Sequence, residues 1–225
     1  MGLATGWDAA FCPDPLPGAG FQFAGAYIGG SSAFRVWPDD ELARVAHMLV
    51  LPIWVPTPFL DNPRQTAIQA AHRLAQVGVP HHARPFRAMM LDLETITNPA
   101  WVNAFAGRLA SLGFDTIPYG SSGDIFLNPR RTGYAVADPT GHPHMYPHPG
   151  VILTQYQFDV QMAGGVVDLD LAEDWLLAHL GPLGDHPHPL VTAGLLPGLA
   201  DPDGTDPSGA PGSLPGDPPD LGKPT

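Results

Sequence analysis

The stretch Ala88-Met-Met-Leu-Asp-Leu-Glu-Thr95 combines an apolar β-strand with two carboxylates near its end. Side chains alternate between the faces of a strand, so Asp92 and Glu94 should point to one side and Leu91 and Leu93 to the other. At about 3.3 Å per residue the two acidic positions are roughly 6–7 Å apart. Carboxylates in an apolar strand are costly to bury unless they are partnered or functional. The stretch therefore predicts a strand that ends in a functional site.

Two further carboxylates occupy comparable positions. Asp8 lies at the end of a short strand-like run, and Asp168 lies in Val166-Val-Asp-Leu-Asp-Leu171. Functional residues of β/α barrels lie at the C-terminal ends of strands. If the last strand closes a barrel against the first, Asp168 comes near Asp8, and the four carboxylates meet at one end of that barrel.

Apolar runs of strand length alternate with helical patterns as far as about residue 181. We expect strands at residues 5–10, 21–28, 49–55, 88–95, 116–120, 133–137, 151–158 and 166–171. We expect helices at residues 38–48, 63–77, 98–112 and 174–180. The pattern predicts an α/β fold, a TIM-like barrel of about five β/α units followed by three more strands. Ala163-Gly-Gly165 predicts a hairpin turn between the last two strands.

The composition changes abruptly after Gly181. Residues 182–225 are dominated by Pro, Gly, Asp, Ser and Leu, and carry six acids against one lysine. Such a segment buries too little apolar surface to offset its ordering entropy. We therefore expect a barrel domain at residues 1–181 and an irregular tail at 182–225. Two interpretations of the tail stay open: a flexible extension, or a peptide that docks on a protein partner through Leu190, Val191, Leu195, Leu196 and Leu199.

Charge and hydropathy exclude several classes of protein. A net charge of −12 argues against nucleic acid and anionic membranes as partners. The N-terminus lacks the basic start and apolar run of a signal peptide, and no stretch approaches the ~20 apolar residues of a membrane helix. We expect cytoplasmic synthesis without membrane insertion. Lys223 is the only lysine beside nine arginines, which suggests a GC-rich genome such as that of an actinobacterium or its virus.

No metal or cofactor is expected. His142, His144 and His148 are spaced by prolines in a loop-like segment, where histidines are more often surface residues than ligands. Cys12 is the only cysteine, so no internal disulfide can form. The sequence contains no phosphate-binding loop, nucleophilic triad or zinc motif.

Four motifs, in order, resemble glycoside hydrolase family 25, the peptidoglycan muramidases or lysozymes of bacteria and phages. On the first, fourth, seventh and eighth expected strands they read Gly6-Trp-Asp8, Asp92-Leu-Glu94, Gln155-Tyr156 and Val167-Asp-Leu-Asp170. Leu51-Pro-Ile-Trp-Val55 and Tyr119-Gly-Ser121 are also similar to related glycoside-hydrolase-like barrels of actinobacteria. The resemblance covers about residues 5–181.

The resemblance implies a retaining, lysozyme-like hydrolase that cleaves bacterial cell-wall glycan. It makes Glu94 the general acid on the leaving oxygen, and Asp92 the group that orients the sugar's 2-acetamido group as it attacks the anomeric carbon. Asp8 and Asp168 would complete the acidic floor. Clustered carboxylates disfavour one another's ionisation, so one of them is expected to stay protonated near neutral pH. Substrate contacts are expected from Tyr27, Tyr119, Gln155 and Tyr156.

The chain departs from the family pattern in three places. Pro13-Asp-Pro-Leu-Pro-Gly18 replaces the first helix, Thr154 replaces the usual tryptophan before Gln155, and the proline- and histidine-rich segment 139–149 replaces the helix after the sixth strand. Two functions therefore remain. The first is a muramidase-like hydrolase acting at the cell wall or in a phage particle. The second is a weak or inactive barrel that serves as a glycan-binding or structural module of a phage virion, such as a minor tail protein.

Overall fold

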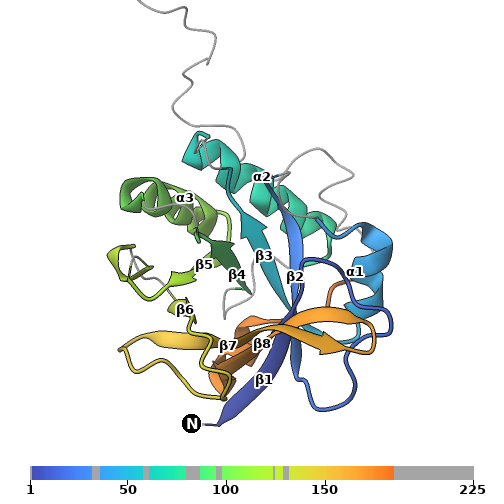
Figure 1. Ribbon diagram of the computed structural model, residues 1–225. Coiled ribbons are helices and arrows are strands. Elements are labelled where there is room, and N and C mark those ends of the chain that lie inside the picture. Colours follow the sequence, from blue (N-terminus) through green and yellow to red (C-terminus); the bar gives the residue numbers. More distant parts are fainter. Residues whose placement is uncertain are drawn as a thin grey trace, which may run out of the picture.

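A computed structural model describes residues 2–31, 36–57, 61–79, 87–94, 98–123, 125–128 and 132–184. Eight strands form a closed barrel in which each strand pairs with its sequence neighbours and the last returns to the first (Figure 1). These strands are β1 (Leu3–Asp8), β2 (Phe23–Gly30), β3 (Leu49–Val55), β4 (Arg87–Asp92), β5 (Phe114–Ser121), β6 (Tyr134–Ala137), β7 (Val151–Met162) and β8 (Gly165–Glu173). The expected TIM-like α/β barrel is confirmed.

The barrel is mixed in direction. Strands β1 to β7 run parallel, whereas β8 is antiparallel to both β7 and β1. Met162 and Gly165 pair across the short turn that joins β7 to β8, and a connection this short can join only antiparallel strands. Closure then sets β8 beside β1, with Asp168 in register with Asp8.

Three α-helices cover the outside of the barrel on one side: α1 (Asp39–Val45), α2 (Pro63–Gln76) and α3 (Pro99–Ser111) (Figure 1). Helices α2 and α3 begin alike. Asn62 and Asn98 accept hydrogen bonds from backbone N–H groups of the first turn, and a proline follows each asparagine. Within the described ranges, β5 leads into the 3₁₀ turn η1 (Ile125–Leu127), and β1 and β6 lead into irregular loops.

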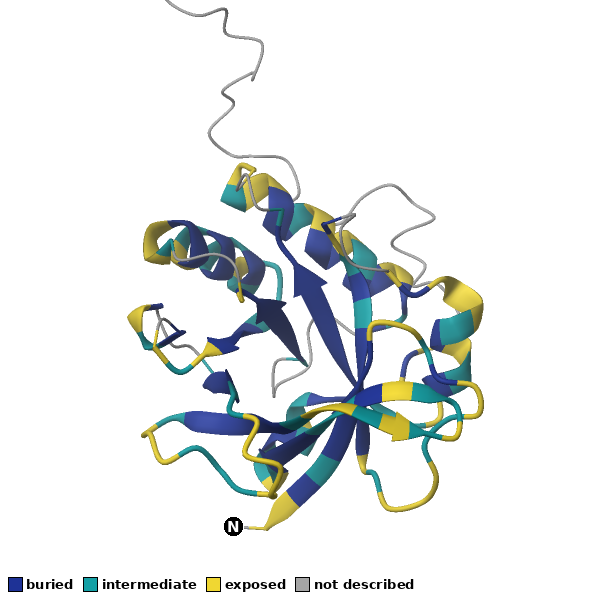
Figure 2. Cartoon of the chain, in the orientation of Figure 1, coloured by how far each residue is buried: buried dark blue, intermediate teal, exposed yellow. Residues whose placement is uncertain are grey.

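The buried side chains form two layers, and the strands are buried along most of their length (Figure 2). Trp7, Trp37 and Phe105 belong to the layer between strands and helices, where the two tryptophan rings stack with centroids 6.1 Å apart. Phe23 and Met90 belong to the layer inside the barrel. Toward the C-terminal ends of the strands, the inward positions carry polar groups instead, which places the polar site at that mouth.

Two elements end differently from the expectation. Strand β4 stops at Asp92, because the Asp92 carboxylate accepts the backbone N–H of Glu94 at 3.2 Å and turns the chain; Thr95 lies outside the described residues. The helix expected at residues 174–180 is present as the 3₁₀ helix η2 (Asp174–His179) and not as an α-helix. The Asp174 carboxylate accepts a hydrogen bond from the Gly2 N–H at 3.0 Å, and Arg87 donates one to the Leu180 carbonyl. These contacts hold both ends of the short segment 174–180.

The described chain continues past Gly181 to Gly184. Gly181 forms a β-bridge with Val50, and the Leu183 side chain is only 6% exposed. A side chain at Gly78, which follows α2, would overlap the Gly184 backbone, so this segment packs closely on the end of that helix. Residues 185–225, which include the leucines and valine considered for docking, lie outside the described residues.

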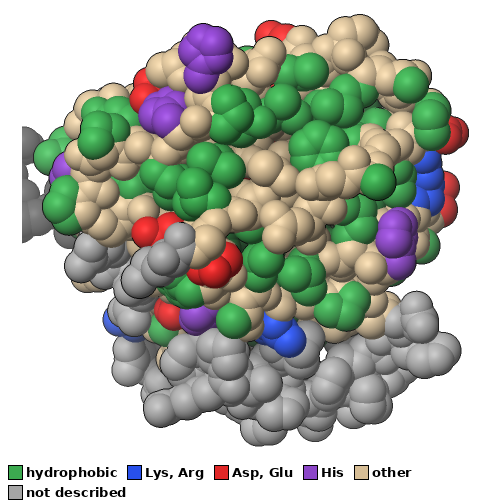
Figure 3. Space-filling view, turned by 90° about the horizontal axis from the view of Figure 1, so that it is seen from below, with side chains coloured by type: hydrophobic (Ala, Val, Ile, Leu, Met, Phe, Trp, Pro, Cys, Tyr) green, Lys and Arg blue, Asp and Glu red, His purple; other side chains and the backbone are tan. Residues whose placement is uncertain are grey.

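The surface has few cationic groups. On the face seen in Figure 3, hydrophobic side chains are dispersed and lysine and arginine side chains are sparse. The described part of this face therefore presents no broad positive patch. Among the helices of the described ranges, none has both the length and the apolar character needed to span a membrane.

Candidate active site

The structure brings the four expected carboxylates together at the C-terminal mouth of the barrel. Asp8 on β1 lies in register with Asp168 on β8 and with Gly25 on β2, and is 1% exposed. A Cβ atom on residue 25 would lie 2.5 Å from the Asp8 Cβ, so the glycine leaves the room that Asp8 occupies. Electrostatic repulsion links Asp8 to Asp92 and Asp168, and links Glu94 to the same two aspartates.

Asp92 and Glu94 differ sharply in their surroundings. Asp92 is the last residue of β4 and is 5% exposed, whereas Glu94 lies in the following turn and is exposed. Because the Asp92 carboxylate holds the Glu94 backbone N–H, the two side chains are fixed relative to each other at one strand end. One carboxyl group therefore lies beneath the mouth, and its neighbour can be reached by a ligand.

A chain of polar side chains crosses the barrel from Glu94. The Tyr119 hydroxyl lies 3.1 Å from Glu94 Oε1 and also contacts Gln155 Oε1. The Gln155 Nε2 atom lies 2.8 Å from Asp8 Oδ2 and 3.4 Å from Asp168 Oδ2. Strand β7 positions Gln155, and β5 positions Tyr119 opposite Asp92 on β4. Four strands thus contribute side chains to one continuous network around Glu94.

A fifth carboxyl group, Asp170, was not among the expected site residues. It is 2% exposed, forms a side-chain hydrogen bond with Asp8, and its Oδ1 atom is buried without a partner among the described residues. The signal was available in Val167-Asp-Leu-Asp170, because period-two alternation puts residues 168 and 170 on the same face. Its depth in the barrel could not be read from that pattern.

Burial dominates the electrostatics of the cluster. It raises the pKa of Asp92 to about 7, with the Glu94 charge adding to the shift. Burial, reinforced by the Asp168 charge, raises the pKa of Asp8 to about 8. The pKa values of Asp168 and Asp170 are raised for the same first reason. The site therefore retains protons at neutral pH on carboxyl groups that would be ionised in water.

The four residues expected to contact substrate are not equally accessible. Tyr27 is partly exposed, and burial together with the charges of Asp8 and Asp92 raises the pKa of its hydroxyl, so this ring faces the cluster. Tyr119, Gln155 and Tyr156 are 3%, 4% and 6% exposed. Both ends of the Gln155 amide are engaged within the protein. Gln155 is thus placed to hold other site residues in position.

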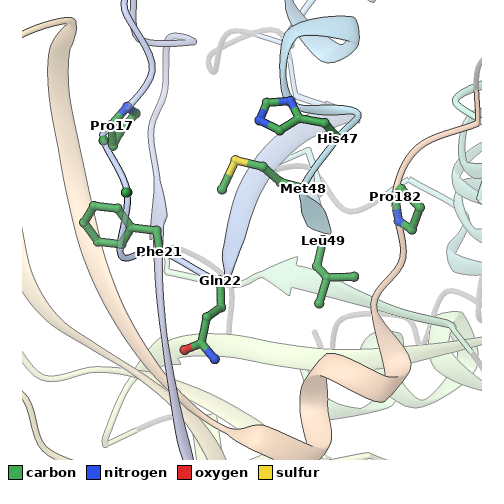
Figure 4. Close-up of a pocket in the computed structure, with 9 residues that line it drawn as sticks. Pro17, Phe21, Gln22, His47, Met48, Leu49 and Pro182 are labelled. Atoms are coloured by element: carbon green, nitrogen blue, oxygen red, sulfur yellow. The ribbon is translucent and has the colours of Figure 1, made fainter.

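Two cavities differ in their relation to the carboxylates. A cavity of about 500 Å³ runs between the loop after β1 and the β7–β8 hairpin, and its lining includes Asp168, Asp159 and Phe11. A cavity of about 520 Å³ lies at the opposite end, before β2 and β3 (Figure 4). Its described lining contains His47 and Gln22 but no carboxylate. Of these two cavities, the first is the one that opens beside the cluster.

The segment after β6 is held by specific contacts. His144 Nε2 lies 2.8 Å from Asp138 Oδ2, and Thr154 Oγ1 accepts the Tyr146 backbone N–H at 2.8 Å. The His148 ring stacks on Phe126 with centroids 3.7 Å apart. In the parts of the chain that the structure describes, no three His, Cys, Asp or Glu side chains are grouped to hold a metal ion. These histidines therefore have structural contacts.

No protein-family model and no curated protein matches the chain. Solved structures match its fold. An uncharacterized B. stearothermophilus protein gives a TM-score of 0.59 at 19% identity, covering 79% of this chain and 99% of that chain. A family GH25 lysozyme from Aspergillus fumigatus gives a TM-score of 0.55 at 13% identity, covering 80% of this chain and 100% of the lysozyme chain. A muramidase from Acremonium alcalophilum gives a TM-score of 0.54 at 13% identity, covering 78% of this chain and 98% of the muramidase chain. At these identities the similarity shows a shared fold.

Proposed function

We propose that this barrel is a muramidase-like glycoside hydrolase that cleaves the glycan strands of bacterial peptidoglycan. The observation that carries the proposal is the pairing of buried Asp92 with exposed Glu94 at the mouth, inside a cluster of further carboxyl groups. Two carboxyl groups in different surroundings are what glycoside hydrolysis requires, because one must give a proton while another supports positive charge at the anomeric carbon. The shared fold with lysozymes supports the same reaction class.

The accessibility of each carboxyl group suggests its role. Glu94 is exposed, so in this proposal it protonates the leaving oxygen as general acid. Asp92 lies beneath it and orients the 2-acetamido group of the sugar, whose oxygen attacks the anomeric carbon with retention. Asp8 and Asp168 hold the polar floor through Gln155. Tyr27 is the partly exposed ring that faces the carboxylates and would contact the sugar.

The groove beside Asp168 is the proposed path of the glycan. Its lining combines the Phe11 ring, which is 60% exposed, with the carboxylates of Asp159 and Asp168. The Asp159 N–H donates to Asp168 Oδ1 at 2.8 Å and so aims the Asp168 carboxylate along the groove wall. An aromatic surface beside hydrogen-bond acceptors suits a sugar, which has an apolar face and hydroxyl donors. The same proposal makes the protein a phage-encoded enzyme that acts at the cell wall. It also has the segment beyond Gly184 bind a protein partner.

Release of reducing sugar from purified actinobacterial cell walls tests the function. Wild type should release it, and Glu94→Gln should lose about 10²–10⁴-fold of the rate while its fold is retained, since an amide cannot donate the proton. Glu173→Gln is the matched control. It makes the same charge change at the last residue of β8, at the end of the barrel away from the carboxylate cluster. No release by wild type from any wall would favour the glycan-binding or virion module instead. Equal release by Glu94→Gln would remove Glu94 from the general-acid role.

A further inference from the structure

The groove beside Asp168 is closed at one end. One wall is formed by residues 9–12 of the loop after β1, and the other by the β7–β8 hairpin. Away from the carboxylate cluster the walls are joined, because the Asp14 N–H donates to the Gly164 carbonyl at 2.9 Å. A side chain at Gly164 would overlap the Pro15 carbonyl, so the contact is close. A glycan strand that continues past the site cannot run through this closed end, whereas a branch of the strand can occupy it.

The hairpin wall has an unpaired strand edge. Strand β8 pairs with β7 from Gly165 onward, but its pairing with β1 begins only at Asp168, opposite Asp8. Over residues 165–167, the edge of β8 on the side of β1 therefore has no partner strand within the described chain. An unpaired edge can add an extended peptide through main-chain hydrogen bonds. A sugar has no such backbone, so this edge favours a peptide.

The side chains around this edge are apolar and mostly small. Ala10 and Phe11 lie on one wall and Val166 and Val167 on the other, and Val166 is 47% exposed. Methyl groups of a ligand that cover such a surface remove it from water, which favours binding. The cavity of about 500 Å³ is within the range of sites that enclose small ligands. A short peptide with small apolar side chains fits this lining.

One carboxylate of the groove is available to a cation. Both oxygens of Asp168 are engaged, since Oδ1 accepts the Asp159 N–H at 2.8 Å and Oδ2 lies 3.4 Å from Gln155 Nε2. The Asp159 side chain is exposed and has no hydrogen-bond or ion-pair partner among the described residues. The described lining contains no lysine, arginine or histidine. The groove is therefore complementary to a ligand that carries a positive charge.

The pairing of the hairpin fixes the position of Asp159. The register shifts between Gln157 and Val160, so residues 158 and 159 share the place opposite Asp168. A bulge of this kind re-aims a side chain at the edge of a site. Asp159 has a φ of 54°, which aspartate tolerates better than most residues, and the Asp168 carboxylate holds its N–H. A carboxylate of the cluster thus positions the carboxylate of the groove.

We propose that this groove binds the peptide that peptidoglycan carries on its muramic acid, with a free primary ammonium group of that peptide beside Asp159. Such peptides contain alanine and a diamino acid, whose side-chain amine is positively charged until it is cross-linked. The peptide lies extended along residues 165–167, and the sugar that carries it lies at the open end beside Asp168. The inference rests on the proposed function, since it names the substituent of the glycan that the same site recognises.

NMR titration of the ¹⁵N-labelled full chain with soluble fragments tests the proposal. The first probe is a disaccharide with muramic acid at its reducing end and a peptide with a free side-chain amine; it lacks the linkage that the proposed hydrolase cleaves. The second has that amine acetylated, and the third lacks the peptide. Wild type should bind the first about 1.5- to 5-fold more tightly than the second, as for an exposed ion pair, and less so at high salt. Amide signals of residues 165–167 should shift with the first two fragments and not with the third.

Variants at position 159 isolate the charge. Asp159→Asn removes it and keeps a residue that accepts a positive φ, so this variant should bind the free and acetylated amines equally. Asp159→Gly also suits a φ of 54°, should behave in the same way, and decides if the asparagine variant does not fold. Asp40→Asn makes the same charge change at an exposed position of α1, outside the groove, and should keep the wild-type preference.

Four results would overturn the proposal. Equal binding of the first two fragments by wild type would exclude recognition of the ammonium group. A preference that persists in the folded variants would exclude Asp159. Shifts of residues 165–167 with the third fragment would show that sugar occupies the strand edge. If the third fragment with a deacetylated sugar binds as tightly as the first and weakens in Asp159→Asn, the ammonium belongs to the sugar.

Binding needs no turnover, so this inference and the proposed function can fail separately. A wild type that prefers the free amine but releases no sugar from cell walls contradicts only the proposed function. A wild type that hydrolyses cell walls and binds both amines equally contradicts only the assignment of the groove.

Discussion

Asp92→Asn should stabilise the protein, and more so at pH 8 than at pH 5. Asp92 is 5% exposed, and burial and the Glu94 charge raise its pKa from 3.8 to about 7. A group whose pKa is higher in the folded chain binds more protons there than in the unfolded chain at pH values between the two, so unfolding becomes easier as pH rises through that window. The contribution of Asp92 is therefore present below about pH 4 and is lost toward pH 7–8. Asparagine has no charge to bury and still accepts the Glu94 N–H through its carbonyl oxygen.

The size of the effect follows from the two pKa values. With 3.8 for the unfolded chain and about 7 for the folded chain, ionisation of Asp92 lowers the free energy of unfolding by about 2 kcal/mol at pH 5 and about 4 kcal/mol at pH 8. The advantage of Asp92→Asn over wild type should therefore grow by about 2–3 kcal/mol across this range. For a chain of this length, that corresponds to about 4–12 °C in melting temperature.

Urea unfolding of wild type and variant at pH 5, 6, 7 and 8 measures this difference. Asp40→Asn, an exposed substitution in the first turn of the outer helix α1, is the control and should follow the wild-type pH dependence. If the wild-type and Asp92→Asn curves stay parallel from pH 5 to pH 8, Asp92 does not bury a charge at neutral pH. The division between a buried and an exposed carboxyl group at the end of β4 would then be refuted.

Two further predictions concern the rest of the chain. A chain ending at Gly181 should lose about 1.5–3 kcal/mol of stability in urea unfolding relative to one ending at Gly184, because it lacks the buried Leu183 side chain; equal stabilities would show that residues 182–184 add nothing. His144→Asn should cost up to about 1 kcal/mol at pH 5.5 and less at pH 8.5 in the same assay. The His142 carbonyl and then Asp138 raise the pKa of His144, so its stabilisation is full below the ordinary histidine pKa and disappears as pH rises through the raised one; a loss that grows with pH would contradict this assignment.

Much of the fold was predictable because its signals are local. Strand alternation and the proline and glycine positions around α2 and α3 are properties of short segments, and the structure has the barrel that they predict. The hairpin predicted at residues 163–165 joins the last two strands, and the predicted closure of the barrel placed the last strand beside the first, where Asp168 does lie opposite Asp8. The 3₁₀ form of the helix at Asp174–His179 was not predictable, because the contacts from Gly2 and Arg87 that hold its ends are not part of any local pattern.

The sequence by itself determined which residues could form the site: acids spaced by two on apolar strands, and glutamine and tyrosine on neighbouring strands. Only the tertiary structure decided how deeply each of them is buried and which groups it contacts. Gln155 meets Asp8 across 147 positions of sequence, and Asp170 meets Asp8 because β8 runs antiparallel beside β1. Burial, hydrogen-bond direction and proton affinity depend on everything that surrounds a side chain. Barrel closure sets those surroundings for strands far apart in the chain, whereas the alternation of a single strand sets only the face on which a residue lies.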